Sequence, residues 1–186
     1  MVKVGFIVEG SCEKIMVESQ NFCSFLKQKD YELVRPVIDA EGGGNLLPKN
    51  IDAYIKQLDG KNIEKIFVVT DLEDEESIEI VRQRIQHERI EFSFIAVKAI
   101  EAWFLADTEA MKSWLEEQQF YETEPEKTTD KPWDRLKEIA SSLDKRGPGS
   151  KVTFAKKMIK YHNFCITKSA LHPNCPSAKE FVDYFN

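Results

Sequence analysis

The sequence predicts an α/β fold in which a mainly parallel sheet of four strands is flanked by helices. Apolar strand patterns alternate with amphipathic helix patterns through the first two thirds of the chain, as parallel strands joined by helical crossovers require. The strand patterns lie at residues 3–8, 32–38, 65–70 and 92–97. Helix patterns lie at residues 12–29 and 46–58, in a segment ending near residue 88, and at residues 101–117.

The last third of the chain carries no convincing strand pattern. Three helix patterns, at residues 133–143, 152–161 and 177–185, are separated by turns that contain glycine or proline. Residues 122–131 are polar and contain a proline, so they are the candidate linker. We therefore expect a Rossmann-like α/β core in residues 1–120 and a helical extension in residues 121–186 that packs on it.

Composition is that of an ordinary soluble protein, with 42% hydrophobic and 31% charged residues in a chain of 186. No stretch approaches the roughly 18 apolar residues of a membrane span, and the first apolar run is too short for a signal peptide. We expect no membrane partner and a cytoplasmic location. The four cysteines form no CxxC pair, so free thiols are expected rather than a disulfide framework.

The net charge of −6 hides an asymmetry. Residues 145–179 contain eight lysines and arginines but no aspartate or glutamate. The lysines of the helix pattern in this stretch are candidate contacts to nucleic-acid phosphates: Lys151, Lys156, Lys157 and Lys160. The alternative is that they form only the solvated face of an amphipathic helix.

Carboxylates follow two of the predicted strands. Glu9 ends the first strand, and Asp71, Glu73 and Asp74 follow the third. Ligands bind at the carboxyl ends of parallel strands, so these groups would converge if the two strands are neighbours. Their mutual repulsion requires protons or a cation, and hard oxygen ligands favour Mg²⁺.

Residues near these strand ends are candidates for supporting roles. Glu13 follows the first carboxylate by four positions, as a further metal ligand or as an exposed helix residue. Gly10 would allow a sharp turn or the close approach of a phosphate. Asn45 ends a glycine run and would cap a phosphate-binding helix start, although a plain turn fits equally well. Lys98 and Glu101 follow the fourth strand and would reach the same rim.

Other ligand-binding patterns are weak or absent. The chain contains neither GxxxxGK[ST] nor GxGxxG, so ATP would have to come from another subunit. The pattern HxxC…HxxC comprises His162, Cys165, His172 and Cys175. We favour two partly buried cysteines and two turn histidines over a structural zinc, because the intervening loop is short and the ligand order unusual.

Three of these features together resemble the TOPRIM fold, which topoisomerases, bacterial primases and the overcoming-lysogenization-defect nucleases share. They are the run FIVEG followed by Glu13, the glycine loop at residues 42–45, and the strand end VVTD-x-E-D. The stretches KAIEAWFLAD and NCPSAKEFVDYF are similar to a narrower set of small, uncharacterised TOPRIM-like proteins. The resemblance covers residues 1–107 and, more loosely, the tail.

The resemblance implies a Mg²⁺- or Mn²⁺-dependent nuclease acting on DNA or RNA. Glu9 would be the catalytic acid/base, and Asp71 with Glu73 or Asp74 would hold the metal, although the family pattern Asp-x-Asp reads DLED here. Some members of the broader group are encoded beside ABC-type ATPases in bacterial anti-phage loci, which implies an effector subunit with an ATPase partner. The alternatives are a non-catalytic TOPRIM-like binding or regulatory module and a receiver-like or phosphatase domain.

Overall fold

The computed structural model describes residues 1–186, and the chain divides into two units. The first comprises residues 1–95 with Phe185, and the second comprises residues 96–184 with Asn186. This division differs from the expected boundary near residue 120. The helices α5 (Glu101–Ala106) and α6 (Thr108–Leu115) belong to the second unit, because the apolar side chains of α5 pack against helices that come later in the chain.

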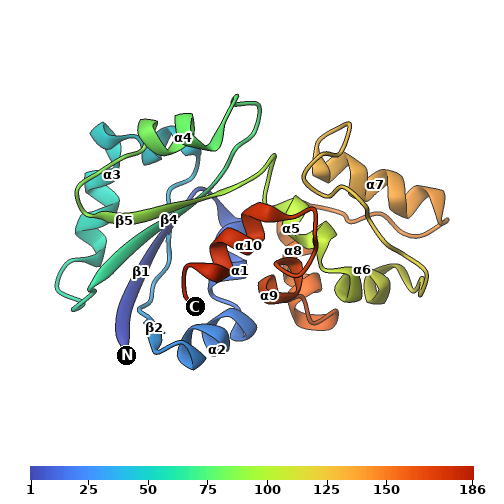
Figure 1. The fold of residues 1–186 in the computed structure, drawn as a ribbon, viewed down its shortest axis with the longest axis horizontal. Helices are drawn as coiled ribbons and strands as arrows, with labels where there is room; N and C mark the ends of the chain where they lie inside the picture. The colour runs from blue at the N-terminus through green and yellow to red at the C-terminus, as the bar shows by residue number, and fades with distance from the viewer. The chain divides into compact units, whose positions relative to one another are not determined.

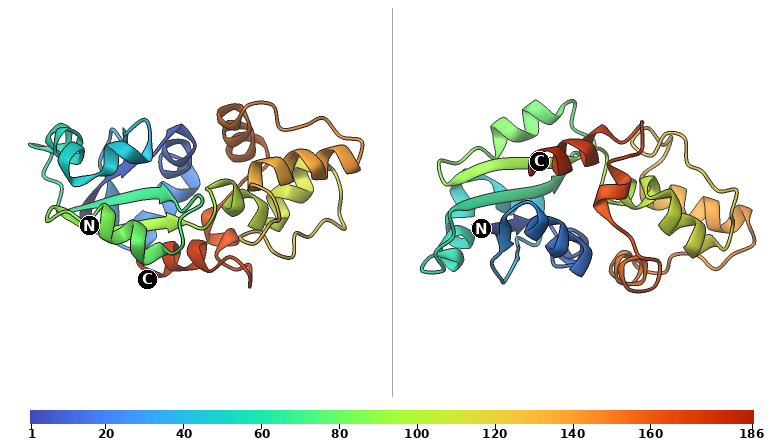
Figure 2. Two further views of the ribbon diagram at one scale, coloured as in Figure 1. Left: turned by 90° about the horizontal axis from the view of Figure 1, so that it is seen from above. Right: turned by 60° about the horizontal axis from the view of Figure 1, so that its bottom comes forward.

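The first unit confirms the predicted α/β class with a mainly parallel sheet (Figures 1 and 2). Its strands are β1 (Val2–Val8), β2 (Tyr31–Leu33), β3 (Ile38–Asp39), β4 (Lys65–Asp71) and β5 (Ile90–Ala96). They form a five-stranded sheet in the order β2-β1-β4-β5, with β3 also paired to β1. Strand β1 is parallel to β2, β3 and β4, and it is therefore the strand around which the sheet is organised.

The strand predicted at residues 32–38 is two short strands instead of one. Both pair with β1, through Leu33 beside Val4 and Ile38 beside Ile7. Pro36 lies between them and has no N–H to donate to a ladder. The interruption therefore follows from the proline, while the apolar pattern on both sides of it is still that of a strand.

Helices cover both faces of this sheet: α1 (Ser11–Val17), α2 (Gln20–Gln28), α3 (Pro48–Ile55) and α4 (Ile78–Arg84), with 3₁₀ turns at Gly43–Leu46 and Lys56–Leu58. The single helix predicted at residues 12–29 is divided between α1 and α2. Ser19 leaves the helical conformation, and its hydroxyl accepts a hydrogen bond of 3.2 Å from the Phe22 amide. Such a cap starts a new helix.

Successive residues of a strand point to opposite faces, and the sheet uses this alternation to build two cores. On one face, Ile7 and Val68 belong to an aliphatic cluster to which α3 and α4 contribute. On the other face, Phe6, Phe67 and Phe94 form an aromatic group with residues of α2. In Figure 1, α3 and α4 lie on one side of the sheet and α2 on the other.

The aromatic core is completed by Phe185, the penultimate residue of the chain. Its side chain is 3% exposed. Its ring centroid lies 5.4 Å from that of Phe67 and 5.8 Å from that of Phe94, and its ring meets that of Phe22 edge to face. Aromatic pairs at these spacings stabilise a core beyond the area they bury. Phe185 is therefore an internal part of the first unit.

The second unit is helical: α5, α6, α7 (Pro132–Ser142), α8 (Lys151–Tyr161), α9 (Ile166–Ser169) and α10 (Pro176–Asp183). The helix predicted at residues 101–117 is divided at Asp107. The carboxylate of this residue accepts hydrogen bonds from the amides of Ala110, at 3.1 Å, and Cys165, at 2.9 Å. Burial nevertheless raises the pKa of Asp107. No pattern in the sequence predicted the short helix α9.

The candidate linker at residues 122–131 is packed into the second unit. Glu122, Glu126 and Thr128 in this segment are buried. Glu126 Oε1 accepts hydrogen bonds from the amide and the hydroxyl of Ser177, at 3.0 and 2.5 Å, at the start of α10. The same hydroxyl accepts a hydrogen bond of 2.7 Å from the Trp103 indole. The segment therefore connects α5 and α10 instead of separating two domains.

None of the helices combines the length and the apolar composition needed to cross a membrane.

Replacement of Phe185 by alanine should lower the free energy of unfolding by about 3–5 kcal/mol, because a buried aromatic ring is lost and a cavity remains. Chemical denaturation followed by circular dichroism measures this change. Leu171→Ala is the control, since Leu171 is 83% exposed and should change stability by no more than about 0.5 kcal/mol. Equal denaturation midpoints for the two variants would show that Phe185 does not anchor the aromatic core.

The pH dependence of stability should report on Glu126, whose pKa is raised by burial above its ordinary value of 4.5. The folded state then holds the proton more tightly than the unfolded state does. The stability that Glu126 contributes is therefore greatest below pH 4.5 and is lost as the pH rises through the raised pKa. Urea denaturation across this range should show the loss in the wild type and its absence in Glu126→Gln. A difference between the two proteins that stays constant with pH would contradict the assignment.

Candidate acidic site

The two strands that carry the predicted carboxylates are direct neighbours. Val8 of β1 lies beside Val69 of β4 in a parallel register, so Glu9 emerges next to the end of β4. Glu9 Oε2 accepts a hydrogen bond from the Thr70 hydroxyl and another, of 3.0 Å, from the Asp71 amide. The structure therefore brings Glu9 and Asp71 together, and the end of β4 fixes one oxygen of the Glu9 carboxylate.

The glycine run lies against the other side of Glu9. The Gly42 amide donates a hydrogen bond of 2.8 Å to the Glu9 carbonyl. A Cβ atom at Gly43 would lie 3.3 Å from Glu9 Oε1, which is closer than ordinary packing allows. Glycine at position 43 thus lets the loop approach the carboxylate. The prediction that Asn45 caps the following helix is wrong, since α3 begins after Leu47 and the Asn45 amide group donates to the Ala40 carbonyl instead.

These groups line a pocket of about 270 Å³. Its charged lining residues are the carboxylates of Glu9, Asp71, Glu73 and Glu75 and the guanidinium of Arg84. Arg84 Nη1 donates to Glu75 Oε1. Sequence analysis identified neither Arg84 nor Thr70 as a site residue. Arg84 lies at the end of a helix, where a basic residue is common, and a threonine inside a strand carries no functional signal.

The remaining predicted ligands of the first unit are not among the residues that line the pocket. Asp74 is exposed beside Glu73 and does not line the pocket. Glu13 is 4% exposed and is also absent from the lining. A Cβ atom at Gly10, the residue before α1, would lie 3.3 Å from Glu13 Oε2. Glu13 therefore turns back toward the start of its own helix.

The donor set of the pocket fits a hard divalent cation. Its charged groups offer carboxylate oxygens, and it has neither histidine nor cysteine among its lining residues. No group of three or more histidine, cysteine, aspartate or glutamate side chains in the chain is arranged to hold a metal ion. Mg²⁺ commonly takes one or two carboxylates and completes its coordination with water and substrate phosphate. The pocket offers carboxylates of this kind but no complete set of protein ligands.

The other predicted site residues belong to the second unit. Lys98 donates to the carbonyls of Thr128 and Asp130. Glu101 is buried at the start of α5, and Lys151 Nζ lies 2.9 Å from its Oε1. That these residues share a rim with Glu9 stays a prediction.

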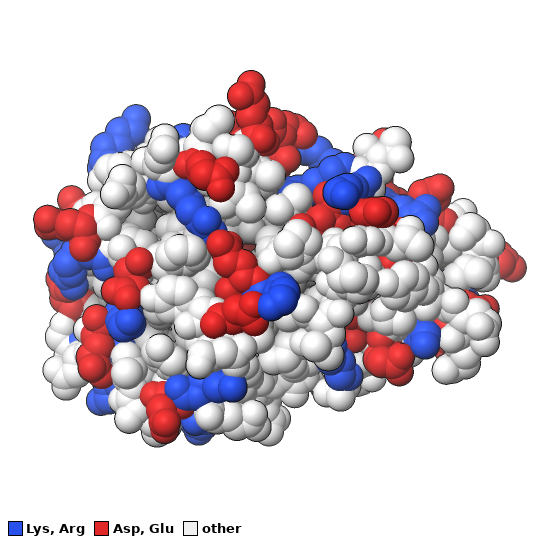
Figure 3. Space-filling model, in the orientation of Figure 1, with Lys and Arg blue, Asp and Glu red and all other residues white.

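The lysines predicted to contact nucleic acid lie on α8. Lys151, Lys156 and Lys160 are exposed, and Lys157 is half-buried. On the face shown in Figure 3, acidic and basic side chains are interspersed rather than gathered into one broad area. Contact between these lysines and phosphates also stays a prediction.

The HxxC…HxxC residues have separate partners in the second unit. His172 Nε2 lies 2.8 Å from the Glu122 carbonyl oxygen. The Cys175 thiol donates to Glu126 Oε1 at 3.2 Å, and burial raises the pKa of this thiol. Burial also lowers the pKa of His162. All four cysteines of the chain are free thiols, as expected.

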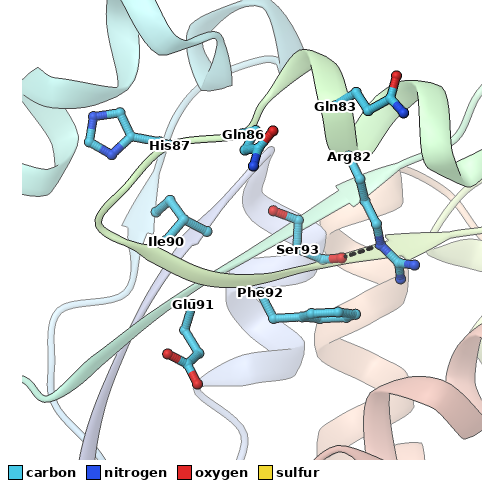
Figure 4. Close-up of a pocket in the computed structure, with 8 residues that line it drawn as sticks. All are labelled: Arg82, Gln83, Gln86, His87, Ile90, Glu91, Phe92 and Ser93. Carbon is cyan, nitrogen blue, oxygen red and sulfur yellow. Dashed lines mark hydrogen bonds between the residues drawn. The ribbon is translucent and has the colours of Figure 1, made fainter.

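A second pocket of the first unit, of about 320 Å³, lies between α4 and β5 (Figure 4). The Arg82 guanidinium lies 4.6 Å from the centre of the Phe92 ring, and Arg82 Nε donates to the Ser93 carbonyl at 3.0 Å. Its one carboxylate, Glu91, pairs with Lys65 at 2.7 Å. This lining has one carboxylate, whereas the acidic pocket has four, so the acidic pocket is the stronger candidate for a site that binds a cation.

Comparisons with family models, curated proteins and solved structures found no match for this chain.

The crowding at Gly43 gives a test of the site's geometry, with Gly44 as its matched control. A Cβ atom at Gly44 would meet no atom within 4 Å. Gly44→Ala should therefore stabilise the protein by about 0.4–1 kcal/mol, because alanine lowers the conformational entropy of the unfolded chain. Gly43→Ala should lack this increase in stability, because its methyl group meets the Glu9 carboxylate. In a protein that already carries Glu9→Ala, the same change should increase stability. Denaturation midpoints of the wild type, Gly43→Ala, Glu9→Ala and the double variant measure the coupling, and additive effects would contradict the contact.

Proposed function

We propose that the protein is a Mg²⁺-dependent, TOPRIM-type nuclease that acts on DNA or RNA. The observation that carries the proposal is the position of Glu9, whose Oε2 accepts hydrogen bonds from Thr70 and from the Asp71 amide within one acidic pocket. Acidic groups at the carboxyl ends of adjacent parallel strands are placed for ligand binding. The resemblance in sequence supplies the reaction class.

Each side chain of the pocket has a role in this proposal. A divalent cation held by Asp71 and Glu73 would neutralise phosphate charge and activate water. Glu73 is preferred to Asp74 because it lines the pocket. Glu9 Oε2 already accepts two hydrogen bonds, so Oε1 is the oxygen that takes or gives a proton during cleavage.

Arg84 supplies the positive charge that a phosphodiester needs beside these carboxylates. Among the charged residues that line the pocket, it is the only cation. Guanidinium groups bind phosphate oxygens through fixed pairs of N–H donors. Arg84 is held at the pocket by its contact with Glu75, so we assign it to the scissile phosphate or to a neighbouring phosphate.

The partners and location follow from the resemblance alone. We propose a cytoplasmic effector subunit of a bacterial anti-phage defence system, with an ABC-type ATPase as partner. The ATPase would supply nucleotide binding, since the chain carries no nucleotide-binding fingerprint. The lysines of α8 would contact phosphates that flank the cleaved bond.

A non-catalytic TOPRIM-like binding or regulatory module is the second candidate. Two observations favour it: the strand end reads Asp71-Leu72-Glu73-Asp74 instead of Asp-x-Asp, and no group of three metal-ligating side chains is formed. Such a module would keep the fold and the pocket but bind its target without cleaving it.

Cleavage of plasmid, oligonucleotides and tRNA in Mg²⁺ or Mn²⁺ tests the first candidate. Glu9→Gln should lower the rate by at least about 100-fold, the usual contribution of a general acid or base. Glu88→Gln is the control, because Glu88 is exposed and does not line the pocket. Equal products from the wild type and Glu9→Gln would exclude the assigned role.

Calorimetry with Mn²⁺ separates the two candidates. A catalytic site should bind the metal and lose most of its affinity in Asp71→Asn, since an amide is a weaker ligand for a hard cation than a carboxylate. A binding module should show no metal heat with either protein. An absence of metal heat together with an absence of cleavage would favour the second candidate.

A further inference from the structure

The second unit contains a buried carboxylate with an unusual environment. Glu101, the first residue of α5, is 2% exposed. Neither of its carboxylate oxygens accepts a hydrogen bond. Its ionic partner is Lys151, whose Nζ lies 2.9 Å from Oε1, so the contact is a charge pair rather than an aligned hydrogen bond. Oε2 likewise accepts no hydrogen bond.

Two other acidic residues buried in the same unit are treated differently. Asp107 accepts hydrogen bonds from two backbone amides, and Glu126 accepts them from an amide, a hydroxyl and a thiol. A carboxylate buried without such donors is destabilising, and an uncharged residue of similar volume generally serves a structural role as well or better. Packing therefore does not explain why an acidic residue occupies position 101.

The partner of Glu101 lies at a position suited to anion binding. Lys151 is the first residue of α8, after the cap Ser150, and its side chain is 50% exposed. Backbone dipoles at a helix start favour anions. The helix also lies within residues 145–179, which contain no aspartate or glutamate. The buried carboxylate thus holds a solvent-accessible ammonium where negative ligands are favoured.

We infer that Glu101 is a positioning residue that orients the Lys151 ammonium for contact with a phosphate of the nucleic-acid substrate. The inference rests on the proposed function, because it names one phosphate-binding group for that substrate. A lysine side chain is flexible and loses conformational freedom when it binds a ligand. A charge buried beneath it restricts the ammonium before binding, and such preorganisation increases affinity.

Binding of a short, fluorescein-labelled single-stranded DNA in EDTA tests this role without metal or cleavage. Glu101→Gln and Lys151→Met should each weaken binding by about threefold to tenfold and reduce the salt dependence by about one counterion. The double variant should bind no more weakly than either single variant, because both changes remove the same contact. Independent, multiplying effects would overturn the coupling between the two residues.

The matched control is the pair that the exposed Glu109 forms with the half-buried Lys112 in the same unit. Their charged atoms lie 3.3 Å apart, and the Glu109 side chain is 69% exposed. Glu109→Gln should leave DNA binding unchanged. Lys151→Arg, which keeps the charge, should restore most of the affinity that Lys151→Met loses.

Thermal unfolding separates a positioning role from a structural one. Glu101→Gln should unfold at the same temperature as the wild type or higher, because it removes a buried charge. A lower unfolding temperature with unchanged DNA affinity would overturn the inference and make the pair structural. A wild-type protein that binds this DNA but cleaves no substrate would refute the nuclease proposal and leave the inference standing. A wild-type protein that does not bind the DNA would overturn the inference.

Discussion

The parallel pairing of β1 with β4 is the interaction on which the first unit depends. It places Phe6 beside Phe67 and Ile7 beside Val68, so a single register aligns the aromatic core on one face and the aliphatic core on the other. The same register carries Glu9 to the end of β4. Because a shift by one residue would exchange the two faces, the buried cores fix the geometry of the acidic pocket.

The second constraint is that a carboxylate removed from water needs compensating partners. The chain supplies these partners in different ways. Glu9 accepts hydrogen bonds from Thr70 and the Asp71 amide. Asp107 and Glu126 also accept hydrogen bonds, but burial dominates and raises their pKa. Glu101 forms an ion pair with Lys151 and accepts no hydrogen bond. The two proposals rest on Glu9 and Glu101, because packing alone does not explain the surroundings of these carboxylates.

Much of the fold could be predicted from local pattern, and the differences have local causes that the sequence contains. Pro36 divides a predicted strand, and Ser19 and Asp107 each divide a predicted helix by capping the helix that follows. These residue types are known breakers and caps, but helical periodicity runs through both capping residues and conceals them. The burial of Glu126 could not be foreseen, because its partners at Ser177 are far along the chain.

The sequence by itself determined the strand pattern and the acidic residues at the strand ends, because strand periodicity and chain direction are local properties. Only the tertiary structure decided that Thr70 and Asp71 hold one oxygen of Glu9, that Arg84 lines the same pocket, and that Asp74 does not. It also decided that Lys151 pairs with Glu101 and that Phe185 completes a core begun at Phe6. These are contacts between residues far apart in the chain, and they depend on how packed elements meet in space rather than on local pattern.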